Sequence, residues 1–160
     1  MISKKVCMLG SFSVGKTSLV SRFVSSVFSD KYLTTVGVKV DKKVVEVNSQ
    51  EVKLMLWDLA GKDDFAELSS THLRGMSGYL LVVDTTRSQT LKIADEIRAL
   101  VEREVGEVPS VVLLNKVDLV DDYDLDPEAV ASFGGVQMRT SCRTGEGVEE
   151  AFLQLTRAML

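Results

Sequence analysis

The chain has 160 residues, of which 45% are hydrophobic and 26% are charged, so we expect a single globular domain over residues 1–160. A net charge of −4, with no block of basic residues, argues against nucleic acid as a partner. No apolar run is long enough to cross a bilayer, and the two cysteines, Cys7 and Cys142, lack metal-site spacing, so we expect free thiols in a reducing, cytoplasmic compartment.

The first predicted element is a buried strand over residues 4–9, which leads into a phosphate-binding loop. Residues 10–18 read Gly-Ser-Phe-Ser-Val-Gly-Lys-Thr-Ser and match the pattern G-x-x-x-x-G-K-[ST]. Gly10 and Gly15 tolerate backbone angles that let successive N–H groups point into one hollow. The helix predicted over residues 17–27 adds its N-terminus, which favours an anion.

Side chains of this loop predict nucleotide and metal binding. We expect the ammonium of Lys16 to contact the β- and γ-phosphates and the hydroxyl of Thr17 to ligate Mg²⁺. The rest of the phosphate cradle is predicted to consist of Ser13, Val14, Gly15 and Ser18. The alternative is a plain Gly-rich turn that opens a helix.

Two strand-like runs follow, over residues 37–47 and 51–57, and the polar turn at 48–50 predicts an antiparallel hairpin. Asp58 comes directly after the second run. A carboxylate there can hold Mg²⁺ directly or through water, and the N–H of Gly61 can reach the γ-phosphate. For Asp58 taken alone, the alternative is a helix N-cap.

The remainder of the chain alternates between helices and strands. We predict strands over residues 79–83, 110–114 and 136–140, and helices over 65–74 (weak), 91–105, after Asp126-Pro127-Glu128, and 147–159. Continuous apolar strands alternating with helices indicate an α/β fold, a mostly parallel sheet covered on both faces. Ligands bind such sheets at the carboxyl ends of the strands, where one pocket would collect the candidate residues.

The run Asn115-Lys116-Val117-Asp118 predicts the choice of base. A carboxylate at Asp118 can accept hydrogen bonds from guanine N1–H and the exocyclic amine, whereas adenine lacks this pair of donors. Asn115 can fix the loop and the base together, and the stem of Lys116 can lie over the ring. The alternative is a polar turn after a strand.

Together these motifs resemble the Ras superfamily of small GTPases, most closely its Rab-like branch. The matching stretches are residues 10–18, 32–38, 57–61, 115–118 and 140–145, in the family's order and spacing. The resemblance implies a P-loop NTPase G domain with a mostly parallel six-stranded sheet, one antiparallel strand and helices on both faces. It also implies a molecular switch that binds GTP or GDP with Mg²⁺ and hydrolyses GTP.

The resemblance also implies roles for single residues. Thr35 is similar to the threonine that reaches Mg²⁺ and the γ-phosphate, with Thr34 as the less fitting neighbour. Phe28 resembles the aromatic residue that meets guanine edge-on, and Tyr32 the tyrosine that covers the phosphates. Ser141 and Cys142 stand where the family has a backbone N–H that meets guanine O6. Arg143 replaces the family's lysine in this motif, and its aliphatic stem can still pack.

Two residues depart from the family's pattern. Lys62 replaces the usual glutamine after Gly61, and an ammonium cannot accept a hydrogen bond from the attacking water. Phe12 replaces Gly or Ser and would crowd the space that an arginine finger enters. We therefore expect slow hydrolysis, with Lys16, Thr35, Gly61 and Lys62 as the catalytic group; Lys62 as a merely solvated residue is the alternative.

Two other functions are alternatives to this one. The same domain could hold GTP or GDP as a non-hydrolysing scaffold, while a phosphate-loop ATPase or kinase is disfavoured by Asp118.

Residues 28–38 and about 60–76 would be the switches that dock effector, exchange-factor or activator proteins. The final residues carry no cysteine to prenylate, so we expect no direct membrane anchor in this chain. Either the protein has no anchor, as in bacterial Ras-like members, or a lipidated C-terminal tail has been removed. We expect a monomer, with a dimer as the alternative.

Overall fold

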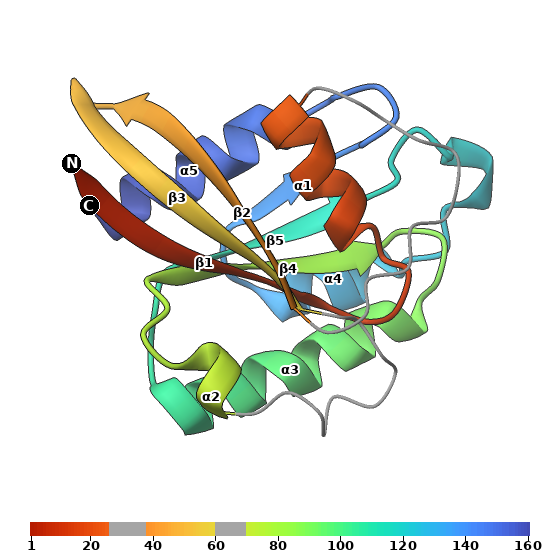
Figure 1. Ribbon diagram of the computed structural model, residues 1–160. Helices are drawn as coiled ribbons and strands as arrows, with labels where there is room; N and C mark the ends of the chain where they lie inside the picture. Colours follow the sequence, from red (N-terminus) through yellow and green to blue (C-terminus); the bar gives the residue numbers. More distant parts are fainter. Residues whose placement is uncertain (26–37, 60–69) are drawn as a thin grey trace.

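A computed structural model describes residues 1–25, 38–59 and 70–160 of the chain (Figure 1). Its centre is a six-stranded sheet in the order β2-β3-β1-β4-β5-β6. All neighbouring strands are parallel except β2 and β3, which are antiparallel, and this confirms the predicted α/β sheet. The strands are β1 Ile2–Gly10, β2 Val38–Val47, β3 Gln50–Leu59, β4 Gly78–Asp84, β5 Ser110–Asn115 and β6 Gln137–Arg139.

Helices cover both faces of this sheet, as predicted. Helices α1 and α5 lie on one face, whereas α2, α3 and α4 lie on the other (Figure 1). Their bounds are α1 Lys16–Ser25, α2 Ser70–Leu73, α3 Gln89–Val105, α4 Pro127–Phe133 and α5 Val148–Met159, with a short 3₁₀ helix at Val120–Asp122. Because β3, β1, β4, β5 and β6 run parallel to one another, their carboxyl ends lie at one common edge of the sheet.

The strand β1 divides the hydrophobic core in two. Its alternate side chains point to opposite faces, so Val6 and Met8 join the core under α1 and α5. Cys7 and Leu9 join the core under α2, α3 and α4. Residues 6–9 of β1 are buried on both faces and form a continuous apolar run, which is the pattern of a parallel strand.

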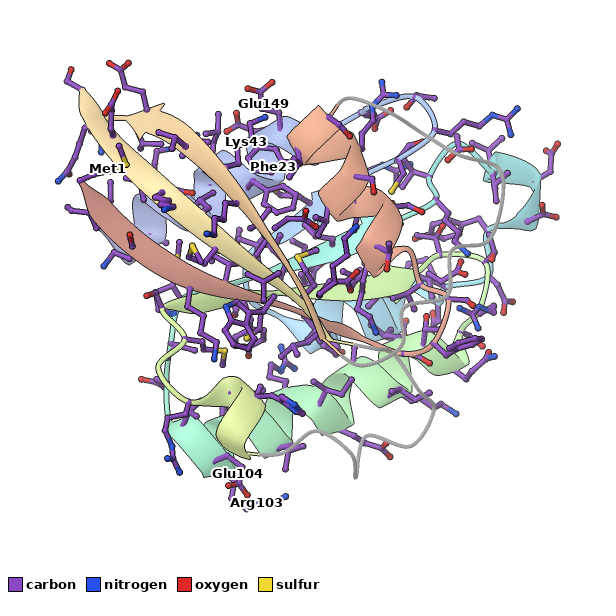
Figure 2. The ribbon with its side chains drawn as sticks, in the orientation of Figure 1. Met1, Phe23, Lys43, Arg103, Glu104 and Glu149 are labelled. Atoms are coloured by element: carbon purple, nitrogen blue, oxygen red, sulfur yellow. The ribbon has the colours of Figure 1, made fainter. Side chains whose placement is uncertain are left out.

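Helix α1 is fixed by aromatic packing beside the hairpin of β2 and β3. The ring of Phe23 stacks on that of Phe152 in α5, with centroids 4.0 Å apart. The ammonium of Lys43 in β2 lies 4.1 Å from the Phe23 ring and donates a hydrogen bond to the Phe23 carbonyl (Figure 2). These contacts hold α1, and with it the loop before it, against the sheet.

Several predicted boundaries were wrong by a few residues. The hairpin turn consists of Asn48 and Ser49 only, both with positive φ, as a two-residue turn between twisted strands requires, and Gln50 already pairs in β3. The weak helix predicted over residues 65–74 ends at Leu73, and its first part lies outside the described residues. The predicted cap was confirmed, because the side chain of Asp126 accepts a hydrogen bond from the Glu128 N–H.

Candidate functional site

The phosphate-binding loop connects β1 to α1 at the carboxyl edge of the sheet. Its two predicted glycines stand where a side chain would collide with the fold. A Cβ on Gly10 would lie 2.6 Å from the carbonyl oxygen of Val82, and one on Gly15 would lie 2.4 Å from the amide nitrogen of Asn115. Both residues also have positive φ. The glycine spacing thus reflects close approach of β4 and of the Asn115 side chain to the loop.

Lys16 is buried at the first turn of α1. Its ammonium donates to the carbonyl oxygens of Gly10, at 2.8 Å, and Ser11, at 3.3 Å, so it folds back across the loop. Burial lowers the pKa of Lys16 to about 8, although the nearby charge of Asp58 opposes the shift. A positive charge held in this poorly solvated place gains strongly from an anionic ligand such as a polyphosphate.

Thr17 and Asp58 meet beside Lys16. The Thr17 hydroxyl donates to Oδ2 of Asp58 at 2.5 Å, which joins the start of α1 to the end of β3. The other oxygen, Oδ1, is buried and receives no hydrogen bond from the described residues. Burial raises the pKa of the Asp58 carboxyl, while the Thr17 hydroxyl and the charge of Lys16 oppose this. An oxygen pair with one unsatisfied buried carboxylate atom fits a hard cation such as Mg²⁺.

Asn115 connects the phosphate loop to the far side of the site. Its amide nitrogen donates to the Val14 carbonyl at 2.9 Å, and its amide oxygen accepts from the Thr140 hydroxyl at 3.0 Å. The residue is buried at the end of β5. The structure therefore confirms the predicted contact of Asn115 with the loop, although the two residues are 101 positions apart in the chain.

The predicted base-recognising residues lie together beyond Asn115. The Ser141 hydroxyl donates to Oδ1 of Asp118 at 2.7 Å and so fixes the carboxylate. The thiol of Cys142 is buried within 3.8 Å of the Asn115 side chain, and burial raises its pKa to about 11. A neutral, unreactive thiol follows, which is the inert behaviour expected for both cysteines.

Comparison with known proteins gives the family. The model of the Ras family matches residues 5–160 of this chain. The chain belongs to the Ras family. Among its relatives is Ras-related protein Rab-4 of Dictyostelium discoideum, 34% identical over 98% of this chain and 78% of that protein. Rab-21 of Dictyostelium discoideum is 34% identical over 99% of this chain and 77% of its own length, and human Rab-8B 30% identical over 98% and 78%.

The relatives place this Ras-family chain in the Rab-like branch, as the sequence motifs indicated. It is a small GTPase of the P-loop NTPase fold, from a family of GTP-binding switches that use GTP or GDP with Mg²⁺ and engage effector and regulatory proteins. In residues 1–25, 38–59 and 70–160 there is no helix with the length and apolarity needed to span a bilayer.

The structure describes some predicted site residues of the Ras-family chain and omits others. Val14 is fully buried, so only its backbone can face a ligand, whereas Ser13 and Ser18 are half-buried and Arg143 is exposed. The predictions for Phe28, Tyr32, Thr35, Gly61 and Lys62 lie outside the described residues.

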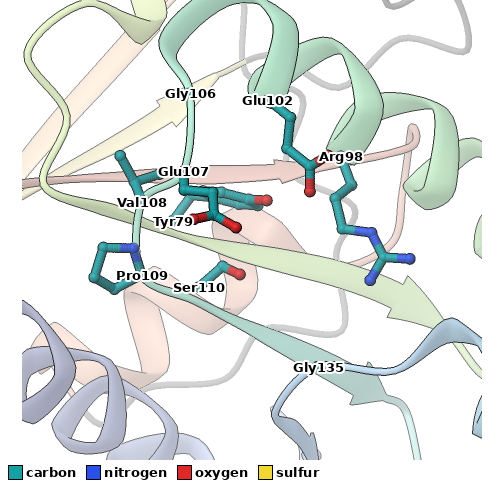
Figure 3. A pocket seen from close by; sticks show the side chains of 9 residues that line it. All are labelled: Tyr79, Arg98, Glu102, Gly106, Glu107, Val108, Pro109, Ser110 and Gly135. Carbon is teal, nitrogen blue, oxygen red and sulfur yellow. The ribbon is translucent and has the colours of Figure 1, made fainter.

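A separate hollow of about 450 Å³ lies at the opposite edge of the sheet (Figure 3). It is lined at the first residues of β4 and β5 by Tyr79 and Ser110, and along α3 by Arg98 and Glu102. Strands β4 and β5 run from this hollow toward Asp84 and Asn115, so it is distinct from the nucleotide site.

Sequence reasoning missed two residues that belong to the site, Asp84 and Arg87. Asp84 ends β4 and binds the ammonium of Lys116 at 2.7 Å, while Arg87 donates to the Phe12 carbonyl at 2.7 Å. The signal for Asp84 was present, because it follows a buried apolar strand in the same way as Asn115. Arg87 had no such signal, because only the fold brings the start of α3 beside the phosphate loop.

Proposed function

We propose that this Ras-family protein is a guanine-nucleotide switch that binds GTP and GDP with Mg²⁺ and hydrolyses GTP slowly. The observation that carries the proposal is that Lys16, Thr17 and Asp58 lie at the same edge as Asn115 and Asp118. The first group suits phosphates and a cation, and the second suits guanine.

The phosphate-side and base-side residues have different tasks in nucleotide binding. Lys16 offsets the charge of the β- and γ-phosphates, and Asp118, fixed by Ser141, accepts the guanine N–H groups. Thr17 and Asp58 would hold Mg²⁺, which supplies charge neutralisation at the phosphate oxygens when bound. The Ser141 N–H donates to the Glu146 carbonyl at 2.9 Å, which is against the predicted role of this N–H at the base, so only the N–H of Cys142 is proposed to face guanine O6.

The proposal that hydrolysis is slow depends on two residues, Phe12 and Lys62. The side chain of Phe12 is 40% exposed on the phosphate loop, where it obstructs an arginine supplied by a partner. Lys62 cannot accept a hydrogen bond from the attacking water, so the water-orienting part of the catalytic group with Lys16, Thr35 and Gly61 is weakened. A long-lived GTP state follows.

We propose that effector, exchange-factor and activator proteins bind residues 28–38 and 60–76 of the GTP-bound or GDP-bound protein. Within these segments, Phe28, Tyr32 and Thr35 would respond to the nucleotide. Buried reduced thiols at Cys7 and Cys142 fit the cytoplasmic compartment that we propose. The second candidate is a scaffold that holds GTP without cleaving it, which the same Phe12 and Lys62 favour.

A single-turnover experiment tests the proposal. The protein is loaded with GTP and Mg²⁺, and phosphate release is followed for the wild type, Lys62→Gln, Phe12→Gly and Lys92→Gln, an exposed lysine of α3 that serves as the matched control. We expect slow turnover in the wild type and in the control, and faster turnover in Lys62→Gln.

The outcomes separate the candidates. No measurable turnover in any variant, with GTP still bound, would favour the scaffold. Fast wild-type turnover that falls in Lys62→Gln would contradict slow hydrolysis and place Lys62 in the mechanism. A protein that binds ATP as well as GTP would exclude the guanine switch itself.

A further inference from the structure

Asp84 is the buried centre of an ionic cluster beside the nucleotide site. The residue is 1% exposed at the end of β4. Its Oδ2 accepts from the ammonium of Lys116 at 2.7 Å and from Nε of Arg87 at 2.9 Å. Its Oδ1 accepts from the backbone N–H and the hydroxyl of Thr86. A carboxylate with four donors is fixed in both position and orientation.

Both cations of this cluster also hold the phosphate loop. The ammonium of Lys116 donates to the Ser13 carbonyl at 3.0 Å, and Nη2 of Arg87 donates to the Phe12 carbonyl at 2.7 Å. Two neighbouring carbonyls of the loop are therefore tied, through two side chains, to one carboxylate on β4. The three segments concerned are far apart in the chain and adjacent in the sheet.

The backbone at these contacts is strained. Ser13 has φ of 61° and Lys116 has φ of 68°, both in the left-handed region that residues with a Cβ rarely adopt. Such conformations persist when surrounding contacts fix them, and they concentrate at ligand sites. The contacts of the cluster meet these two residues directly, so their loss would let the loop and the base-recognising turn relax.

The Asp84 carboxyl is held in its charged form by its neighbours. Burial alone would raise the pKa of Asp84, but hydrogen bonds from Lys116 and Thr86 outweigh it and hold the pKa below its usual value. Asp84 is therefore ionised at neutral pH, and the two cations stay paired.

We propose that Asp84 and Arg87 are positioning residues that set how long the nucleotide stays bound, by holding Phe12, Ser13 and Lys116 in their binding conformation. The proposal rests on the guanine-nucleotide function above and extends it to residues outside the nucleotide motifs. Asp84 and Arg87 act through the loop carbonyls and Lys116 and are not catalytic residues.

The shape of the arginine side chain makes the proposal specific. A guanidinium offers N–H groups in a planar fork, so Arg87 can donate to Asp84 through Nε and to Phe12 through Nη2 at the same time. A lysine has one ammonium, at a different position, and would keep a charge near Asp84 without this bridging geometry. Arg87→Lys therefore separates the bridge from the ion pair.

The test is the rate at which a fluorescent GDP leaves the Mg²⁺-loaded protein in excess unlabelled GDP, at a temperature where every variant is folded. We expect release about tenfold faster in Arg87→Gln, comparably fast release in Arg87→Lys, and at least as large an increase in Asp84→Asn, which loosens both cations. The matched control is Arg157→Gln, which breaks the exposed pair of Arg157 with Glu150 on α5 and should release at the wild-type rate.

A competition between GTP and ATP completes the design. Arg87→Gln should still prefer GTP, because Asp118, Ser141 and the pair of Asp84 with Lys116 are unchanged. Wild-type release from Arg87→Gln, wild-type release restored in Arg87→Lys, or a lost preference for GTP would overturn the proposal. Should Arg87→Gln not fold, Arg87→Lys keeps the test valid.

The release rate distinguishes positioning from simple support of the fold, because a residue that only stabilised the fold would change the unfolding midpoint and leave release from folded protein unchanged. A failure of the proposed function has a different result, namely a wild-type protein that retains no GDP. Retention of GDP with no effect of Arg87 would count against the positioning role alone.

Discussion

The two halves of the nucleotide site differ in how well their polar groups are satisfied. On the phosphate side, Lys16 is buried with a lowered pKa and Asp58 has a buried oxygen that no described donor meets. On the base side, Asn115 is bonded to Val14 and Thr140, and Asp118 to Ser141.

This difference indicates how the free energy of binding is divided. The phosphate side holds charges that burial disfavours and that an anionic ligand with a cation would compensate. The base side is already organised by its own hydrogen bonds and needs only a ligand of the right pattern. Substitutions on the two sides should therefore affect stability and affinity in different ways.

The largest effect is expected at Lys16. Lys16→Met keeps the size of the side chain and removes the charge, so GDP affinity should fall about a hundredfold, since a charged contact with the phosphates is lost. The free energy of unfolding without nucleotide should stay equal or rise, by up to about 3 kcal/mol, because the pKa of about 8 shows that burial penalises the ammonium.

Urea unfolding and nucleotide titration measure these two quantities, with Lys92→Met as an exposed control that should alter neither. A large loss of stability in nucleotide-free Lys16→Met would contradict the comparison, because it would mean that the phosphate side is as well satisfied as the base side.

A smaller effect, on specificity, is expected at Asp118. In the variant Asp118→Asn, the Ser141 hydroxyl can still donate to the side-chain oxygen at position 118. The side-chain NH₂ group of the variant then faces the ligand. Guanine would then oppose donor to donor and lose about tenfold or more in affinity, whereas xanthine, with a carbonyl in place of the amine, should gain. Competition between GTP and xanthosine triphosphate measures this, and equal losses for both bases would show that Asp118 does not face the base.

The smallest effect is expected at Asp58, and it concerns the metal. In the wild type, chelating Mg²⁺ should accelerate GDP release, and in Asp58→Asn this acceleration should shrink severalfold, because a neutral amide is a weaker ligand for a hard cation. The control is Asp95→Asn, an exposed acid of α3 that should leave the dependence on Mg²⁺ unchanged. An unchanged dependence on Mg²⁺ in Asp58→Asn would assign the metal to other residues.

Most of the fold could be predicted, since the apolar runs at residues 6–9, 79–83 and 111–114 are uninterrupted. On the site, the motif residues were found because their chemistry requires particular residue types at fixed spacing. Their partners were harder to predict: the bond between Asn115 and Val14 spans 101 residues, and nothing local in the sequence specifies it. The bridge from Arg87 to Phe12 was missed for the same reason.

The sequence by itself determined the element order, the family and the residue types that meet phosphate, metal and guanine, because periodicity and motif spacing are local properties. Tertiary structure decided which of these groups are satisfied. Parallel strands bring β1, β4 and β5 to one edge, and only there do Gly15 and Asn115 come into contact and Asp84 pair with two cations. Burial, which exists only in the folded chain, then shifts the pKa of Lys16 and of Asp58 and sets what the site requires from its ligand.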